Sequence, residues 1–343
     1  MKAVAFYEHG DLDKLKYVDL PEPEISADEV LVRVHACALN HLDIWARQGM
    51  PGVSLPLPHI LGSDIAGEVV RVGSLAAGIE PGQRVLIAPG LCCGRCQYCL
   101  SGSDSLCQDY KIIGFQVNGG YAEYAKAPAT NVIPISTTWS MEEWAAVPLV
   151  FLTAWHMLVT RAGLKPGETV LVQAAGSGIG SAAVQIAKYY NTRVIATAGS
   201  DEKLKKASEL GVDETINYQK EDFVARVRKL TDNRGVDVVF EHLGSEGFEK
   251  SLLCLAKAGR LATCGATSGP TASLDLRYLF MLQASIVGSY MGGKKELLDV
   301  LKLVERKVFK PVVDKVFPLA EAAQAQRRML ERQQFGKLVL SCI

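Results

Sequence analysis

Residues 169–190 have the sequence TVLVQAAGSGIGSAAVQIAKYY and contain the change from strand to helix that decides the fold of this chain. The apolar run 169–173 is typical of a buried strand, and small residues from 181 onward begin a helical pattern. The turn between them is rich in glycine. Such a turn has two interpretations. The glycines serve only for close packing of the helix, or they let backbone N–H groups and the helix N-terminus approach a pyrophosphate. We predict the second, a dinucleotide site at Gly176, Ser177, Gly178 and Ile179.

The same alternation of strand and helix continues after this stretch. Apolar strands are predicted at 193–199, 214–218, 236–240 and 260–266, with helical patterns between them. Continuously apolar strands that alternate with helices predict a parallel sheet covered on both faces, and so an α/β fold. Residues 1 to about 130 differ, because they show short strands separated by Gly, Pro and Asp clusters. A helix and a strand are predicted again after residue 292.

The composition predicts a folded protein, and the only partner that we expect besides its own subunits is a small-molecule substrate. The chain has 343 residues, with 48% hydrophobic and 22% charged residues, which suits two domains with substantial cores. Its formal net charge is zero, so we expect no nucleic acid or anionic membrane as a partner. No apolar run reaches the ~18 residues of a membrane span, and the first residues lack the core of a signal peptide. We therefore expect a cytoplasmic protein.

Four of the nine cysteines have the spacing of metal ligands. They follow C-x2-C-x2-C-x7-C, and in a reducing compartment such a cluster is more typical of a metal site than of disulfides. Four thiolates fill a tetrahedral Zn2+ and leave no position for water or substrate, so the predicted zinc is structural. Cys92 is a possible substitute for Cys93, but only the frame that starts at Cys93 gives two successive x2 steps. The predicted ligands are Cys93, Cys96, Cys99 and Cys107.

The end of the second strand of the parallel sheet indicates which dinucleotide binds. NAD sites place an acid about 20 residues past the glycines, where it binds the ribose 2′-OH, but residues 193–200 end in small neutral side chains, Ser200 included. Lys203 would attract a 2′-phosphate. Asp201 is the competing candidate for a 2′-OH, although an acid is also expected in the first turn of a helix for dipole reasons. We expect NADPH rather than NADH.

Several stretches together resemble the medium-chain dehydrogenase/reductase superfamily, which includes zinc-type alcohol dehydrogenases and quinone oxidoreductases. They are the glycine turn, the cysteine lobe, VRVHACALNHLDIWARQG at 32–49, LGSDIAGEVVRVG at 61–73 and GGYAEYA at 119–125. The resemblance covers essentially the whole chain. It implies a GroES-like catalytic domain of residues 1–135 and 292–343, with a zinc lobe at 90–110, and a Rossmann domain of residues 136–291. It also implies a homodimer or homotetramer, in which a strand near 285–291 pairs between subunits.

The resemblance also implies residues for the cofactor. Quinone-reductase-like members bind the 2′-phosphate through a Gly-x3-Lys, a Tyr fifteen residues further on and an Arg near the C-terminus. The matching positions here are Gly199, Lys203, Tyr218 and Arg332. This match strengthens the expectation of NADPH.

One departure from the family concerns a second zinc. Alcohol dehydrogenases of this family hold a catalytic zinc with a Cys, a His and a later Cys or acid, and those positions here are Asn40, Ser63 and Leu149. None of the three suits that role. His41 and Asp43 remain, but two ligands are fewer than the three that a catalytic zinc normally uses. The alternative is a rebuilt site drawn from His35, His59, His156 and Cys37.

Loss of these ligands favours reduction of an activated double bond. Oxidation of an alcohol removes a proton with a pKa of roughly 16, which a metal makes feasible near neutrality. Hydride addition to an enone or a quinone instead puts charge on a delocalised oxygen, which a hydrogen-bond donor stabilises by about 2–4 kcal/mol. Asn40 is the expected donor, and we place Asp43 and Thr153 with it as catalytic residues. Trp45 either stacks on a flat substrate or belongs to the core.

We therefore predict an NADPH-dependent oxidoreductase with one structural zinc and no catalytic zinc. Its predicted substrate is an enone, 2-alkenal, enoyl thioester or quinone. Two alternatives remain, an alcohol or aldehyde dehydrogenase with an unconventional metal site and a non-enzymatic NADPH-binding protein.

Overall fold

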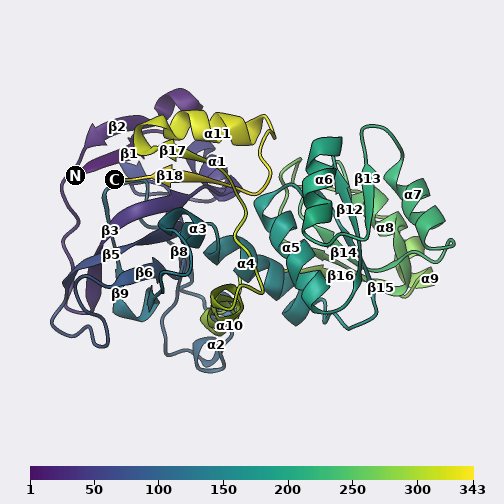
Figure 1. Ribbon diagram of the computed structural model, residues 1–343, viewed down its shortest axis with the longest axis horizontal. Helices are drawn as coiled ribbons and strands as arrows, with labels where there is room; N and C mark the ends of the chain where they lie inside the picture. The colour runs from purple at the N-terminus through teal and green to yellow at the C-terminus, as the bar shows by residue number, and fades with distance from the viewer. The chain divides into compact units, whose positions relative to one another are not determined.

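The computed structural model describes residues 1–343, which divide into two compact units (Figure 1). Unit 1 comprises Met1–Leu149 and Gly293–Ile343, and unit 2 comprises Val150–Gly292. We expected the first boundary near residue 135. It lies later because helix α3 (Met141–Ala145) packs on strands β3 (Glu29–Ala38) and β5 (Asp64–Val72) of unit 1.

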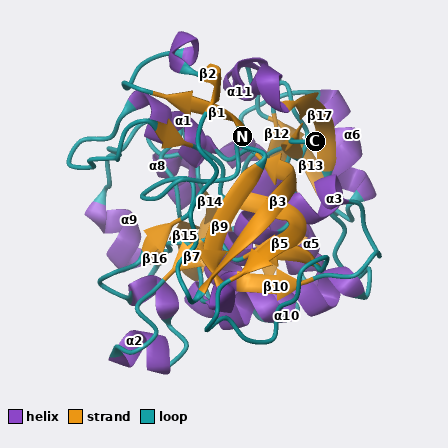
Figure 2. Ribbon diagram, turned by 90° about the vertical axis from the view of Figure 1, so that its left-hand side faces the viewer, coloured by secondary structure: helices purple, strands orange, loops and turns teal.

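Unit 1 is built on a seven-stranded sheet with strand order β10-β6-β5-β3-β18-β17, in which β9 also pairs with β3 (Figure 2). A three-stranded sheet β2-β1-β4 and a two-stranded sheet β7-β8 complete it. The remaining strands are β1 (Lys2–Phe6), β2 (Lys16–Asp19), β4 (His59–Ile60), β6 (Arg84–Ile87), β7 (Gly90–Leu91), β8 (Lys111–Ile112), β9 (Tyr124–Pro128), β10 (Val132–Pro134), β17 (Val313–Pro318) and β18 (Lys337–Ser341). The other helices are α1 (His41–Gln48), α2 (Gln97–Leu100), α10 (Lys294–Glu305) and α11 (Ala322–Leu330).

Strand β18 joins two distant parts of the sequence inside this sheet. It pairs antiparallel with β3, with Val339 opposite Ala38 and Leu340 opposite Cys37. Figure 1 shows β17 and β18, in yellow, among the purple elements that begin the chain. These four residues are apolar and fully buried, so the register of the two strands is fixed by the core. Continued by two residues, this register sets Lys337 across from Asn40.

Unit 2 is a six-stranded, wholly parallel sheet with strand order β13-β12-β11-β14-β15-β16. Its central strands are fully buried, as their continuous apolar sequences predict, and the core includes Leu171, Ile195 and Val239. The strands are β11 (Thr169–Val172), β12 (Arg193–Ala198), β13 (Glu214–Asn217), β14 (Val236–Glu241), β15 (Leu255–Thr263) and β16 (Ser285–Gly288). The helices are α4 (Pro148–Trp155), which begins in unit 1, α5 (Gly178–Tyr189), α6 (Asp201–Glu209), α7 (Phe223–Leu230), α8 (Phe248–Leu253) and α9 (Leu276–Met281).

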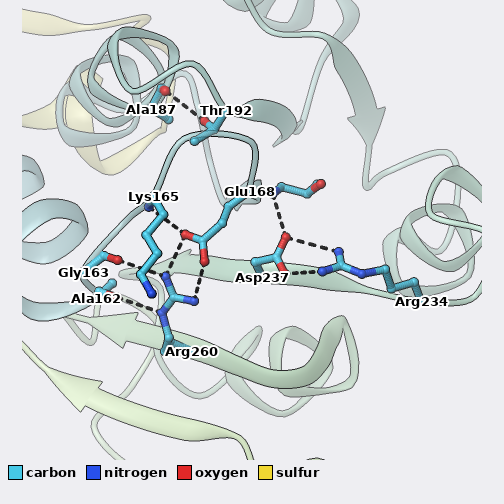
Figure 3. Close-up of polar contacts among 10 residues, drawn as sticks. Ala162, Gly163, Lys165, Glu168, Ala187, Thr192, Arg234, Asp237 and Arg260 are labelled. Carbon is cyan, nitrogen blue, oxygen red and sulfur yellow. Dashed lines mark hydrogen bonds and ion pairs between the residues drawn. The ribbon is translucent and has the colours of Figure 1, made fainter.

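Two arginine–carboxylate pairs fasten the amino end of the parallel sheet (Figure 3). Arg260 donates to both oxygens of Glu168 at 2.8 Å, and its Nε donates to the carbonyl of Ala162 at 2.7 Å. Asp237 accepts the backbone N–H of Thr169 at 2.8 Å and pairs with Arg234. The glycine turn follows β11 at its other end. These pairs are therefore structural and lie away from the predicted cofactor residues.

One helical stretch, Met141–Arg161, has the length and composition of a membrane span. It ends in a π-helical turn, His156–Arg161. Its most apolar window is 67% buried inside the protein, which is the pattern of a core helix.

Candidate active site

The amide of Asn40 lies in a buried polar cluster of unit 1. Asn40 is the N-cap of α1, directly after β3, and is 6% exposed. Its Oδ1 accepts from Lys337 Nζ at 2.6 Å, and its Nδ2 donates to Asp64 Oδ2 at 2.9 Å. Lys337 Nζ also donates to Asp64 Oδ2 at 2.9 Å. The predicted hydrogen-bond donor thus has a cation on one side and an anion on the other.

This ion pair is almost completely withdrawn from water. The side chains of Lys337 and Asp64 are 4% and 0% exposed. The second oxygen of Asp64 accepts the backbone N–H of Leu149 at 2.8 Å. A buried pair persists when further hydrogen bonds satisfy both charges, and this cluster supplies them.

Asp43 is placed as a positioning residue. Its carboxylate accepts the backbone N–H of Asn40 at 2.7 Å, the backbone N–H of Gly62 at 3.1 Å and the hydroxyl of Tyr121 at 3.1 Å. Burial raises the pKa of Asp43 to about 6. Asp43 is 1% exposed, and these bonds fix the backbone around Asn40. Its part in catalysis stays a prediction.

The three positions that hold a catalytic zinc in alcohol dehydrogenases do not fit the ion. Asn40 faces an ammonium group, Ser63 has a buried hydroxyl without a hydrogen-bond partner, and Leu149 offers no ligand side chain. The candidates of the rebuilt site that lie in unit 1, His35, His59 and Cys37, do not form a ligand group with one another. Two groups of three or more His, Cys, Asp or Glu have ligand atoms within 4.8 Å of one another, and neither includes His35, His59, His156 or Cys37.

The cysteine lobe does fit a metal. The sulfurs of Cys93, Cys96, Cys99 and Cys107 lie within 4.8 Å of one another. Backbone N–H groups lower the pKa of Cys93 to about 6, whereas burial raises that of Cys99. Cys92 belongs to a second group with Cys99 and Asp104, which offers three ligands rather than four. Four thiols at this separation are the donor set of a structural zinc.

The glycine turn of unit 2 has the shape predicted for a pyrophosphate site. Ser177 is the N-cap of α5 and accepts the backbone N–H of Gly180 at 2.9 Å. A Cβ on Gly180 would lie 2.4 Å from the carbonyl oxygen of Ala174, so the helix starts in close contact with the turn. Ala174 has a left-handed φ of 47°, a strained conformation that is often found at functional sites. Gly176, Gly178 and Ile179 lie in the same turn and the first turn of α5.

The predicted 2′-phosphate residues of unit 2 converge after β12. A Cβ on Gly199 would lie 2.7 Å from the Tyr218 hydroxyl, so the ring covers that glycine. Ser200 caps α6 by accepting the backbone N–H of Lys203. Asp201 accepts from Asn217 Nδ2 at 2.7 Å and pairs with Lys220, and these two partners lower its pKa. Each oxygen of Asp201 thus has a partner of its own.

The remaining predicted residues lie in different places. Arg332 follows α11 in unit 1 and has a left-handed φ of 53°. The burial of His41 and, to a smaller extent, the positive charge of Arg332 lower the pKa of His41 to about 4. Trp45 is half-buried one turn further along α1 and meets the His41 ring edge-on at 5.0 Å. Thr153 lies on α4 of unit 2, 5% exposed, and its hydroxyl has no hydrogen-bond partner.

Comparison with known proteins shows the family. Residues 26–137 match the alcohol dehydrogenase GroES-like domain, and residues 178–306 match the zinc-binding dehydrogenase family. A protein of Sulfolobus acidocaldarius named NAD-dependent alcohol dehydrogenase is 33% identical over 99% of each chain. The chain belongs to the medium-chain dehydrogenase/reductase superfamily. The predicted fold class, a GroES-like domain with a Rossmann-like parallel sheet, is therefore confirmed.

Different relatives within this superfamily are named for different activities. Human quinone oxidoreductase is 28% identical and covers 99% of this chain and 97% of its own. A crystal structure of an NAD-dependent alcohol dehydrogenase has a TM-score of 0.96 and 48% identity over 99% of each chain. The 2-octenoyl-CoA carboxylase reductase CinF, solved with NADP and 2-octenoyl-CoA, has a TM-score of 0.91 and 31% identity, and the match covers 99% of this chain and 87% of CinF. This protein is thus an oxidoreductase of the superfamily.

The sequence analysis missed Lys337, Asp64 and Tyr121. Asp64 follows Ser63 in a stretch that we compared with zinc ligands, so its position next to the site was visible in the sequence. Lys337 lies at the start of a predicted strand, and nothing local distinguishes it from a solvent-facing lysine. The register of β18 on β3 is the signal that brings it to Asn40.

Proposed function

We propose that this protein is an NADPH-dependent reductase of activated C=C bonds or quinones that uses no catalytic zinc. The observation that carries the proposal is the buried cluster of Asn40, Lys337 and Asp64. An ammonium group 2.6 Å from Asn40 Oδ1 would repel a divalent ion at the position that ligates zinc in alcohol dehydrogenases. The same cluster instead presents an amide as a hydrogen-bond donor.

Asn40 has the chemistry to stabilise a delocalised oxyanion. NADPH held by the glycine turn and the residues after β12 would supply a hydride to the β-carbon of the substrate. The π electrons would then move to the substrate oxygen, and a solvent proton would complete the saturated product. The Asn40 amide donates to that oxygen as its charge develops. A preorganised donor of this kind contributes about 3–4 kcal/mol to the transition state. Thr153, with its buried and unpartnered hydroxyl, is a second candidate donor.

We propose NADPH as the cofactor on the basis of residues after β12. Gly199, Ser200, Lys203 and Tyr218 would receive the 2′-phosphate, with Arg332 as a further cation. Asp201 is bound by Asn217 and Lys220, and these contacts compete with a ribose 2′-OH for its carboxylate. Two of the relatives above are named as NAD-dependent, which makes NADH the necessary comparison.

The proposal includes one zinc per chain, held by the four cysteines of the lobe. It would stabilise residues 90–110 and take no part in the reaction, because four thiolates leave it no open position. Metal analysis of the purified protein tests this directly. One zinc per chain is the expected result, and two would favour an alcohol dehydrogenase.

We also propose a homodimer or homotetramer, formed through α9 and the edge strand β16. Three large apolar side chains on α9 are mostly exposed: Leu276 at 64%, Phe280 at 66% and Met281 at 68%. A cluster of exposed apolar side chains is typical of a protein–protein interface. Sedimentation of wild type and Phe280→Glu tests it, with a smaller species expected for the variant. The cytoplasm stays our prediction for its location.

Turnover of a substrate panel tests the function. The panel contains quinones, 2-alkenals and short enoyl-CoA thioesters with NADPH or NADH, and primary alcohols with NADP+ or NAD+. We expect at least one electrophile to oxidise NADPH. We expect none of the alcohols to reduce NADP+ or NAD+. Alcohol oxidation would establish the alternative dehydrogenase, and no turnover with any pair would indicate a non-enzymatic binding protein.

A further inference from the structure

Each polar end of the Asn40 amide has a partner that accepts only one orientation. Its oxygen faces Lys337 Nζ, which can only donate, and its nitrogen faces Asp64 Oδ2, which can only accept when ionised. A flipped amide would place N–H against the ammonium and oxygen against the carboxylate. The charges therefore fix which way the amide points, something that neutral partners would not do.

These two partners are themselves held from other elements. Asp64 begins β5 and receives the Leu149 N–H on its second oxygen. Lys337 begins β18, whose register on β3 is set by buried apolar pairs. The backbone of Asn40 is fixed separately by Asp43. Three residues from different elements thus hold Asn40, two at its side chain and one at its backbone.

We propose that Lys337 and Asp64 are positioning residues that orient and polarise the Asn40 amide. Nδ2 carries two hydrogens, and Asp64 takes one, so one N–H remains in a defined direction for the substrate oxygen. The charge-assisted bond from Lys337 to Oδ1 draws electron density toward that oxygen, which makes the remaining N–H a stronger donor. This inference rests on the proposed function, because it gives Asn40 its task there.

Asp64→Asn tests the orientation with almost no change in shape. The new amide must turn its oxygen to the Leu149 N–H and its nitrogen toward Asn40, so Asn40 loses the acceptor that fixes it. We expect kcat to fall about 10²-fold, as for loss of a preorganised donor, with little change in KM. Asn40→Ala should show a similar fall, and Lys337→Arg, which keeps the charge, should retain more activity than Lys337→Met.

A double-mutant comparison separates positioning from general damage. If Asp64 acts through Asn40, then Asp64→Asn in the Asn40→Ala background lowers kcat by less than about 3-fold. The matched control is Asp314→Asn, because Asp314, like Asp64, pairs with a cationic side chain, here Arg328, and accepts a backbone N–H, here that of Phe335. It should leave kcat unchanged.

The inference is overturned if Asp64→Asn keeps full kcat, or if its effect adds in full to that of Asn40→Ala. Should Lys337→Met fail to fold because it leaves a buried charge, Lys337→Met/Asp64→Asn removes both charges and serves instead. If the wild type turns over no electrophile, the proposed function has failed. Atomic-resolution structures of wild type and Asp64→Asn then decide the inference, since the amide of Asn40 must differ in orientation between them.

Discussion

Replacing Arg260 by Met should strongly lower the free energy of unfolding of unit 2. Arg260 and Glu168 are 20% and 17% exposed, so each is mostly withdrawn from water. Removing one partner of a buried pair costs about 3–5 kcal/mol. Because a fifth of each side chain still reaches solvent, we take the lower value, about 3 kcal/mol. The expected fall in melting temperature is then about 6–12 °C for a unit of this size.

The control is Arg234→Met at the same end of the sheet (Figure 3). Arg234 is 57% exposed, whereas its partner Asp237 is 16% exposed and also accepts the Thr169 N–H. Because water reaches the arginine and the carboxylate keeps a backbone partner, we expect a loss nearer about 1 kcal/mol. Scanning calorimetry of the zinc-loaded proteins measures both variants, and kcat at 25 °C should be unchanged in each. Equal melting temperatures for the two variants would refute the argument from burial, and a tenfold fall in kcat would refute the structural role.

Three further outcomes are expected. Cys107→Ser should reduce bound zinc from about one per chain to near zero by mass spectrometry, whereas Cys92→Ser should keep it. Lys203→Ala should raise KM for NADPH about 10- to 100-fold, the value of a charged hydrogen bond, and leave KM for NADH nearly unchanged; equal effects on both would contradict a 2′-phosphate site. The pKa of His41 is lowered from 6.5 to about 4, so the folded state resists its protonation, and stability present above pH 6.5 should be lost as the pH falls toward 4. Urea unfolding of wild type should show a loss of up to about 3 kcal/mol over that range that His41→Gln lacks, and parallel profiles would contradict it.

Features formed by residues that are close together in the sequence could be predicted from it. The strand, turn and helix at 169–190 follow from local periodicity, and the cysteine lobe follows from spacing within one short segment. Both depend on residues that are neighbours in the chain, so physical proximity is already given.

The Asn40 cluster could be predicted only in part, because its members are far apart in sequence. Lys337 lies 297 residues from Asn40 and 273 from Asp64. Strand pairing brings them together, and the partner of a strand depends on the whole sheet rather than on its own residues. The extension of unit 1 beyond residue 135 had no local signal either, because it depends on the packing of α3 on β3 and β5.

The interruption of unit 1 by unit 2 has a consequence for how the protein is made. On the ribosome, β3 and β5 emerge early, but the strand that carries Lys337 follows only after all of Val150–Gly292 has been synthesised. Until then Asp64 lacks its counter-ion, and the edge of β3 at residues 36–38, which β18 later covers, has no strand partner. Assembly of the Asn40 cluster is thus a late event in biosynthesis.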